Sequence, residues 1–202
     1  MNADIKKIVI ATQNSGKATE IKLIMKDIDV EFISLDEKKM QHNVQEDGDT
    51  FQKNADIKSI AYNLHTGLPA LGDDSGLEVD ALNGAPGLHS NRYYGINRSD
   101  REKYLMLLKD LKDISWNHRT ARFRCAAALA DCGKVICRGE GIVEGRILFN
   151  PRGEKGFGFD PVFLYEPLNK SFAELQKEEK SNISHRGRAL KIIKEFLLRK
   201  IS

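Results

Sequence analysis

The chain has 202 residues, of which 41% are hydrophobic, so it is long enough to bury a sizeable core. Its 32 basic and 29 acidic residues give a formal charge of +3 and are spread along the chain, which excludes a basic nucleic-acid-binding arm and favours small anions as partners. Three cysteines without a Cys-x-x-Cys spacing argue against a disulfide framework or a zinc site, and the apolar run near the start is too short for a signal peptide or a membrane span. We therefore expect a single domain over residues 1–202 in the cytoplasm, with neither a nucleic-acid polymer nor a membrane as partner.

The first half of the chain alternates strand-like and helix-like segments. Short apolar runs at 7–12, 30–35 and 68–73 are separated by helical patterns at 16–27 and 50–67, which predicts an α/β fold with parallel strands. Gly67 stands where the second helix needs a C-terminal cap. Apolar residues at near-helical spacing support that helix: Phe51, Ala55, Ile57, Ala61 and Leu64.

The second half has a different pattern. Ser99 and Glu102 have capping-box spacing and predict a helix start. Two long alternating runs, 119–131 and 134–145, flank the turn "DCGK" and predict an antiparallel hairpin, so the sheet should be mixed. A glycine-rich loop then leads to a short capped helix at 171–174 and to a last amphipathic helix at 186–200.

The segment "ATQNSGKATE" at 11–20 raises the question of a phosphate-binding loop. A P-loop would require glycine where Ala11 stands and a hydroxyl residue where Ala18 stands, so that motif is absent. A strand end followed by a helix N-terminus remains, and its free N–H groups favour an anion. The segment from Thr12 to Lys17 is therefore a candidate phosphate site outside the P-loop class.

Acidic residues give the second candidate. Asp73 and Asp74 are predicted at the end of an apolar strand, before a Ser-Gly turn, and adjacent strand residues point to opposite faces. One could hold Mg²⁺ and the other could brace the loop, while the alternative is a plain turn made of turn-forming residues. Glu46 could be a further metal ligand or a solvated loop carboxylate, and Lys58 taken alone would be a surface charge.

Two later motifs offer contacts for a flat base and for phosphate. "GFGFDPVF" at 156–163 places glycines around Phe157, which would allow a base to approach, with Asp160 as a hydrogen-bond acceptor; core packing of both phenylalanines is the alternative. "KSNISHRGRALK" at 180–191 places His185 and Arg186 at a helix entrance near Lys180, where they could donate to a base oxygen or to phosphate. A solvated helix start is the alternative interpretation of that motif.

Five segments in this order resemble one family, the inosine triphosphate pyrophosphatases, which hydrolyse non-standard purine nucleoside triphosphates. The matching segments span almost the whole chain: "TQNSGK" (12–17), "EDGDTFQKNADIK" (46–58), "DDSGLEVDALNGAPGLHSNRYYG" (73–95), "GFGFDP" (156–161) and "EEKSNISHRG" (178–187). The Asp-Asp-Ser-Gly and Ser-His-Arg-Gly motifs are specific together, whereas the first segment alone is weak.

The resemblance implies an α/β fold of two lobes around a long central mixed β-sheet flanked by helices, a homodimer, and Mg²⁺-dependent conversion of ITP, dITP or XTP to the nucleoside monophosphate and pyrophosphate. By position, it makes Glu46 and Asp74 the metal ligands and Asp74 also the general base. The substrate contacts that it implies are Thr12, Gln13, Asn14, Ser15, Gly16, Lys17, Lys58, Ser75, Phe157, Gly158, Phe159, Asp160, Lys180, His185 and Arg186.

Two positions depart from the family pattern, and two other classes compete with it. Gln13 stands where the family often has glycine or asparagine, and Phe159 where it often has tyrosine, which bears on specificity more than on the reaction. A Maf-like nucleotide pyrophosphatase and a nucleotide- or RNA-binding module without catalysis are the competing interpretations. An acidic cluster beside phosphates has no purpose in a metal-free binding module, because it would repel them.

Overall fold

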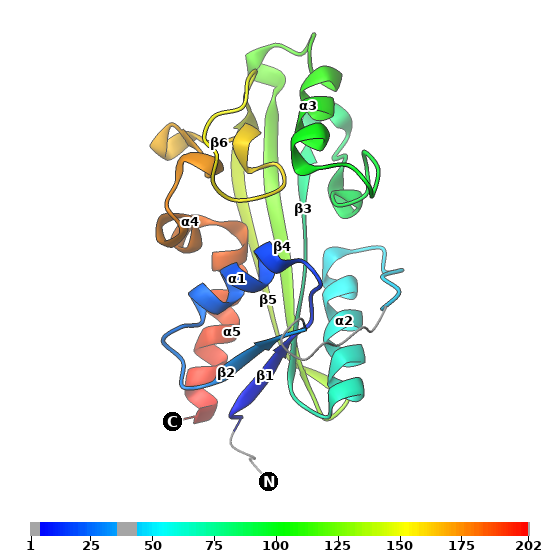
Figure 1. Ribbon diagram of the computed structural model, residues 1–202, viewed down its shortest axis with the longest axis vertical. Coiled ribbons are helices and arrows are strands. Elements are labelled where there is room, and N and C mark those ends of the chain that lie inside the picture. Colours follow the sequence, from blue (N-terminus) through cyan, green and yellow to red (C-terminus); the bar gives the residue numbers. More distant parts are fainter. Residues whose placement is uncertain (1–4, 36–43, 202) are drawn as a thin grey trace. The chain divides into compact units, whose positions relative to one another are not determined.

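The computed structural model describes residues 5–35 and 44–201. Within them, seven strands are hydrogen-bonded in the order β2-β1-β3-β4-β5-β6-β7 (Figure 1). The strands are β1 (Lys7–Ile10), β2 (Glu31–Ser34), β3 (Ala70–Val79), β4 (Thr120–Asp131), β5 (Lys134–Ile147), β6 (Phe163–Tyr165) and β7 (Lys170–Ser171). The α-helices are α1 (Ser15–Ile24), α2 (Phe51–Thr66), α3 (Asp100–Asp110), α4 (Lys177–Ile183) and α5 (His185–Ile201).

The sheet is mixed, as the sequence predicts. Strand β1 pairs in parallel with both β2 and β3, whereas β6 pairs antiparallel with β5 and β7. The β4–β5 connection is the two-residue turn Cys132-Gly133, and both residues have positive φ, 50° and 74°, as a tight hairpin turn requires. The α/β class, the parallel first half and the hairpin are therefore confirmed.

The described chain forms two compact units. The first contains residues 5–35, 44–74, 125–141 and 185–201, and the second contains 75–124 and 142–184. Each unit has its own apolar core: Ile8, Ile21 and Leu190 belong to the first, and Leu77 and Phe163 to the second. The single domain over residues 1–202 that the sequence predicts stays a prediction.

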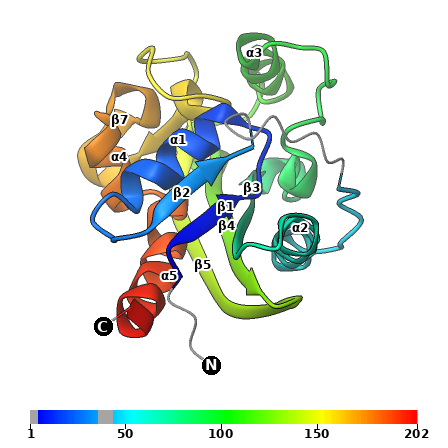
Figure 2. The same cartoon turned by 60° about the horizontal axis from the view of Figure 1, so that its bottom comes forward.

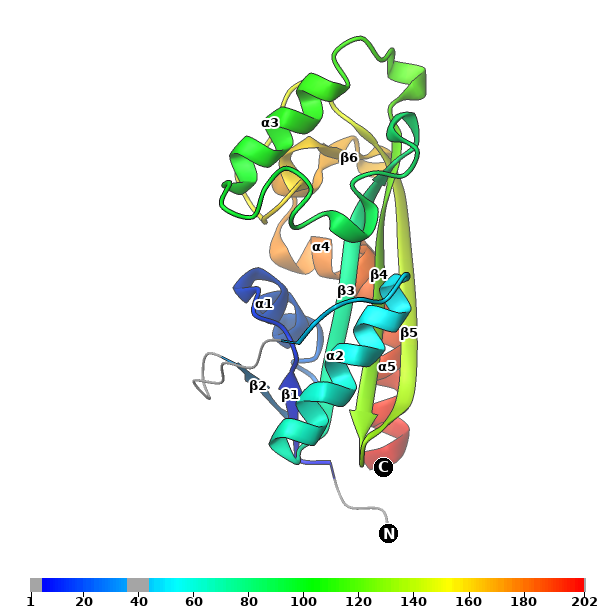
Figure 3. The ribbon, with the colours of Figure 1, turned by 90° about the vertical axis from the view of Figure 1, so that its right-hand side faces the viewer.

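In the first unit, helices pack on both faces of the strands. Ile8 and Ile10 of β1 join a core with α1 and α5, while Val9 and Ala11, which alternate with them, pack with Tyr62 of α2. Successive strand residues point to opposite faces, so α1 and α5 cover one face and α2 covers the other (Figures 2 and 3). Because helices cover both faces of the strands, the direction in which a β3 side chain points determines which helix it contacts.

Local capping signals predict the helix ends well. Thr50 caps α2 and accepts a hydrogen bond from the Lys53 amide, and Gly67 ends the helix in the left-handed conformation, with φ 68°. Ser99 and Glu102 form the predicted capping box of α3. Ser171 and Glu174 do the same for a short 3₁₀ helix, Phe172–Glu174.

Two interpretations of local structure are wrong. Strand β3 does not end at Asp73 and Asp74; it continues as one strand to Val79, so neither the predicted Ser-Gly turn nor the plain turn exists there. The alternative of a solvated helix start at the Ser-His-Arg-Gly motif is also wrong, because His185 and Arg186, at the predicted start of α5, are 4% and 1% exposed. Helix α4 precedes α5 over the charged run. Pairing with neighbouring strands overrides the turn propensity of Asp, Ser and Gly in β3.

The buried face of α2 contains several polar side chains. Leu64 is 69% exposed, whereas Asn54, Lys58 and Asn63 are all buried. The buried residues Phe51, Ala55, Ser59 and Tyr62 complete the same helical face. Of the apolar residues that indicate this helix, Phe51 and Ala55 are on the buried face and Leu64 is not. Polar groups on β3 and in nearby loops satisfy the buried polar side chains.

The three cysteines lie in described segments and are all free thiols. Burial and the neighbouring Asp73 carboxylate raise the pKa of Cys125 to about 12, so this thiol stays protonated. No helix within residues 5–35 and 44–201 is long and apolar enough to cross a membrane.

Candidate active site

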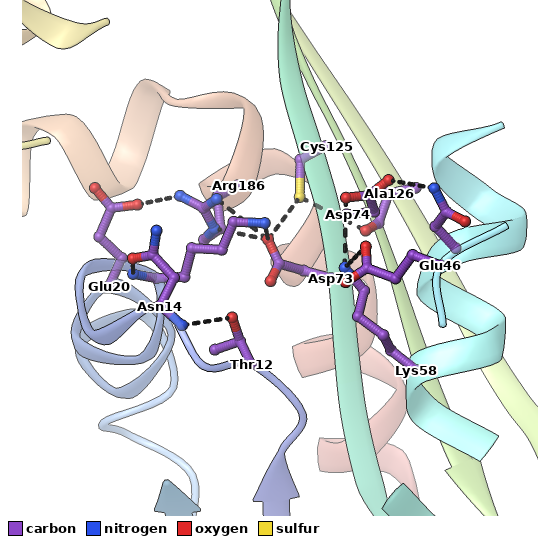
Figure 4. A network of polar contacts seen from close by, with 12 residues as sticks. Thr12, Asn14, Glu20, Glu46, Lys58, Asp73, Asp74, Cys125, Ala126 and Arg186 are labelled. Atoms are coloured by element: carbon purple, nitrogen blue, oxygen red, sulfur yellow. Dashed lines mark hydrogen bonds and ion pairs between the residues drawn. The ribbon is translucent and has the colours of Figure 1, made fainter. Parts of the chain in front are cut away.

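Asp73 is the centre of a closed ionic cluster on the α1/α5 face of β3. Its Oδ2 accepts from Nε and Nη2 of Arg186 at 3.2 and 3.1 Å, and Nζ of Lys17 lies 3.3 Å away. Nη1 of Arg186 also donates to the Glu20 carboxylate of α1. Figure 4 shows Arg186 with its contacts to Glu20 and Asp73. Asp73 is fully buried, and Arg186 is 1% exposed.

This cluster is balanced in charge. Burial alone would raise the pKa of Asp73, but Lys17, Arg186 and Lys58 outweigh burial and hold that pKa well below its usual range. Burial alone would likewise lower the pKa of Arg186, while Asp73 and Glu20 keep it raised. Asp73 is therefore a permanent anion that holds two cations in place.

Asp74 points to the other face of β3, toward α2 (Figure 4). Its Oδ2 accepts from Nδ2 of Asn54 at 3.0 Å, and its Oδ1 lies 3.4 Å from Nζ of Lys58. The same lysine Nζ lies 2.9 Å from Oε2 of Glu46. The expectation that Asp73 and Asp74 point to opposite faces of the strand is confirmed, because side chains alternate along β3.

Gly72 makes this close approach of β3 and α2 possible. A Cβ at this position would lie 2.6 Å from the Ala55 carbonyl oxygen and 2.9 Å from the Ser59 amide nitrogen. Both atoms are helix backbone and cannot give way as a side-chain end would. Only glycine lets the strand come near enough for Lys58 to reach Asp74.

Lys58 is buried, and the interpretation of it as a surface charge is wrong. Burial alone would lower its pKa, but Asp74, Asp73 and Glu46 outweigh that effect and raise the pKa above its ordinary value. The ammonium group thus stays charged between two carboxylates. Taken together, Lys58, Glu46 and Asp74 bring one cation to two carboxylates, so this group has an excess of negative charge.

The loop between β1 and α1 has the form of an anion site. Asn14 is the N-cap of α1, and its side chain accepts from the Lys17 amide at 3.1 Å, while its own amide donates to Thr12 Oγ1 at 3.2 Å. Gln13, Asn14 and Ser15 are exposed, and Thr12, Gly16 and Lys17 are partly exposed. The first N–H groups of a helix have no partner within it, so this end of α1 can receive an anion.

The glycine-rich loop of the second unit forms its own cluster. Asp160 Oδ2 accepts from the Phe157 amide at 2.9 Å and from Nζ of Lys180 at 2.5 Å, and the lysine Nζ lies 4.9 Å from the centre of the Phe157 ring. Gly158 donates its amide to Asp100 at 2.7 Å. Phe157 is partly exposed, and the stacking of a base on its ring stays a prediction.

Phe159, Ser75 and His185 lie in other surroundings. Phe159 is 5% exposed and packs in the core of the second unit, which matches the core alternative for its ring. Ser75 is partly buried within β3. His185 is the first residue of α5 and is 4% exposed. The substrate contacts predicted for these three residues remain predictions.

Oxygen ligands for a divalent cation are present beside Lys58. No group of three or more His, Cys, Asp or Glu side chains able to hold a metal occurs in the described part of the chain. Mg²⁺ needs no such cage, because it is usually bound by one or two carboxylates together with water and substrate phosphates. Glu46 and Asp74, which already share one cation and leave an excess of negative charge, fit a Mg²⁺ ion of this kind.

Comparisons with known proteins agree with the motifs. A model of the Ham1 family matches residues 8–196. The chain belongs to the Ham1 family. It is 46% identical to a dITP/XTP pyrophosphatase of Desulforamulus reducens, over 96% of each chain, and 45% identical to one of Geobacter sulfurreducens, over 95% of this chain and 96% of the relative.

Solved structures of Ham1 proteins have the same fold. One from Coxiella burnetii has a TM-score of 0.85 and 40% identity, covering 96% of this chain and 99% of that one. The Staphylococcus aureus Ham1 protein has a TM-score of 0.84 and 39% identity, covering 96% and 100%. The family resemblance and the fold class inferred from the motifs are thereby confirmed.

Sequence reasoning missed two residues of this candidate site. Glu20 follows Lys17 by three positions on α1, and Asn54 precedes Lys58 by four positions on α2, so each shares a helix face with a residue that was recognised. That spacing was an available signal. Neither residue stands out in the sequence, because an isolated Glu or Asn on a helix is usually solvated.

Proposed function

We propose that this protein hydrolyses the non-standard purine nucleoside triphosphates ITP, dITP and XTP to the nucleoside monophosphate and pyrophosphate, with Mg²⁺, and so removes deaminated purines from the nucleotide pool. The single observation that carries the proposal is the pair of carboxylates, Glu46 and Asp74, held around one buried lysine. The names of the D. reducens and G. sulfurreducens relatives support the substrate class.

The triphosphate needs cations and N–H donors. Lys17, at the start of α1, and Lys58, between the two carboxylates, supply positive charge within the first unit. The exposed side chains of Asn14 and Ser15 and the first N–H groups of α1 add donors. In phosphoryl transfer most of the catalytic effect comes from such positioning and charge stabilisation.

Glu46 and Asp74 would hold Mg²⁺. When bound, the ion neutralises phosphate charge and polarises a phosphoryl oxygen.

Asp74 is better suited than Asp73 to act as the general base. Asp73 is fully buried, is bonded to two cations, and has a pKa held far below the range in which it would accept a proton. Asp74 is 7% exposed and lies in the half of the site that carries excess negative charge. In the proposed reaction, Asp74 takes a proton from the water that attacks the α-phosphorus, the bond to the bridging oxygen breaks, and pyrophosphate leaves.

Base recognition is assigned to Phe157, Lys180, His185 and Arg186, following the family pattern. The 6-oxygen of hypoxanthine and xanthine accepts a hydrogen bond, whereas the 6-amino group of adenine would leave a buried donor unpaired, at a cost of about 1–3 kcal/mol. Arg186 already directs donors at Asp73 and Glu20, which gives it an additional role in holding the cluster together.

The experiment is release of pyrophosphate from ITP, dITP, XTP, GTP and ATP, each measured with Mg²⁺ and with EDTA. We expect Mg²⁺-dependent release from the first three at roughly ten- to a hundredfold higher kcat/KM than from ATP, from the unpaired-donor cost. Preference for pyrimidine nucleotides would favour a Maf-like activity instead. Binding without release, independent of Mg²⁺, would favour the non-catalytic binding module.

We also infer that the protein acts in the cytoplasm as a homodimer, as the family resemblance implies. Light scattering of the purified protein gives its mass in solution, and a monomeric mass would contradict the second inference.

A further inference from the structure

Asn54 connects the Asp74 carboxylate to the acidic segment that carries Glu46. Its Nδ2 donates to Asp74 Oδ2 at 3.0 Å, and its Oδ1 accepts from the Gly48 amide at 2.8 Å. One amide group thus bonds simultaneously to strand β3 and to the segment 44–49. Because Glu46 lies two residues before Gly48, this amide ties both proposed metal ligands to the same point on α2.

The contact is tight on both sides. Asn54 is 4% exposed, so its amide has little access to solvent. A Cβ at Gly48 would lie 2.6 Å from Asn54 Oδ1, which shows how closely the segment approaches. On the other side, Asp74 has one oxygen bonded to Asn54 and the other near Lys58, so two contacts fix the plane of the carboxylate.

From this geometry, and resting on the proposed function, we propose that Asn54 is a positioning residue. It orients the Asp74 carboxylate and holds the Glu46 segment against it, without itself contacting the substrate. Partners of this kind, which orient a ligand or a base from behind, are needed for full activity even though they carry no chemistry themselves.

Helix α2 supplies a matched control in Asn63. Asn63 is also 4% exposed, and its amide also makes two hydrogen bonds, from Nδ2 to the Leu68 carbonyl at 2.8 Å and from the Gly133 amide to Oδ1 at 2.7 Å. All of these partners are backbone groups. The same substitution at Asn63 therefore removes an equally buried amide that makes the same number of hydrogen bonds, and it affects neither Asp74 nor Glu46.

The test compares Asn54→Asp with Asn63→Asp. Each variant keeps an acceptor for its amide partner and loses its donor, but at position 54 the new carboxylate oxygen faces Asp74. With ITP at saturating Mg²⁺, we expect kcat of Asn54→Asp to fall about 10- to 100-fold, the usual effect of removing such a partner. We expect KM to change less than about threefold, because Asn54 touches none of the residues predicted to bind the base. Asn63→Asp should keep the wild-type kcat, and equal melting temperatures of the two variants would show that stability is not the cause.

Asn54→Ala and Asn63→Ala give a second readout that does not depend on activity. Asn54→Ala removes the acceptor of the Gly48 amide, so amide hydrogen exchange in residues 44–49 should accelerate, and in Asn63→Ala it should not. Unchanged exchange in Asn54→Ala, or equal loss of kcat in the two Asp variants, would overturn the positioning role. If the wild-type protein released no pyrophosphate, the proposed function would fail, and the exchange experiment would still decide whether Asn54 holds the segment.

Discussion

The two faces of strand β3 carry adjacent aspartates in opposite electrostatic situations. On the α1/α5 face, Asp73 and Glu20 meet Lys17 and Arg186, so the charges balance, and Asp73 and Arg186 are almost completely buried. On the α2 face, Asp74 and Glu46 share Lys58, and the Glu46 side chain is 37% exposed. A balanced, buried cluster holds structure, whereas an unbalanced and partly open one attracts a cation. We therefore propose that the two adjacent aspartates have different roles, Asp73 in the scaffold of the site and Asp74 on its reacting side.

The largest expected effect on stability comes from Asp73→Asn. It would leave Arg186 and Lys17 without their shared carboxylate, and breaking a buried ion pair costs about 3–5 kcal/mol. The free energy of unfolding in urea measures this loss. Asp56→Asn is the control, because Asp56 pairs with the exposed Arg138 and such surface pairs contribute about 0–1 kcal/mol. Equal losses in the two variants would show that the Asp73 cluster is not the scaffold.

A smaller effect should follow from Gly72→Ala. The added methyl group would press on the backbone of α2 at the Ala55 carbonyl, and overpacking of this kind costs about 1–3 kcal/mol. Since Lys58 and Asn54 reach Asp74 from α2, pyrophosphate release should fall as well. Thermal unfolding and kcat are the measurements. A variant with wild-type values of both would mean that the close approach of strand and helix is unnecessary.

The smallest effect should come from Leu64→Gln on the outer side of α2. Leu64 is 69% exposed, and surface substitutions usually change stability by less than about 0.5 kcal/mol. Its urea unfolding curve should overlay that of the wild type. A loss above about 1.5 kcal/mol is typical of a buried aliphatic side chain and would contradict the exposed position of Leu64.

The sequence predicts those features that depend on local chemistry. Caps and turns act within a few residues, so they can be predicted before the fold is known. Examples are the capping box of Ser99 and Glu102, Gly67 at the end of α2 and the Cys132-Gly133 turn. The family motifs also make Asp74 and Lys58 candidate site residues, because the sequence around each residue resembles a motif of the family.

Features set by distant partners could not be predicted in this way. The Asp-Asp-Ser-Gly segment has turn propensity, yet pairing with neighbouring strands keeps it extended. The buried face of α2 is polar, since Asn54 and Lys58 find their partners on β3 and in the 44–49 segment. Glu20 is identified only once Arg186, 166 residues later, is placed beside it. In each case the deciding partner is distant in sequence and near in space.

The most direct test of the division between the two aspartates is Asp74→Asn, measured for ITP binding and for pyrophosphate release. We expect binding and the urea unfolding curve to stay close to wild type, and turnover to fall about 10²–10⁴-fold, the usual contribution of a general base. Full turnover in Asp74→Asn, or an equal loss of turnover in an Asp73→Asn protein of unimpaired stability, would contradict the assignment of Asp74 to the reacting side and Asp73 to the scaffold.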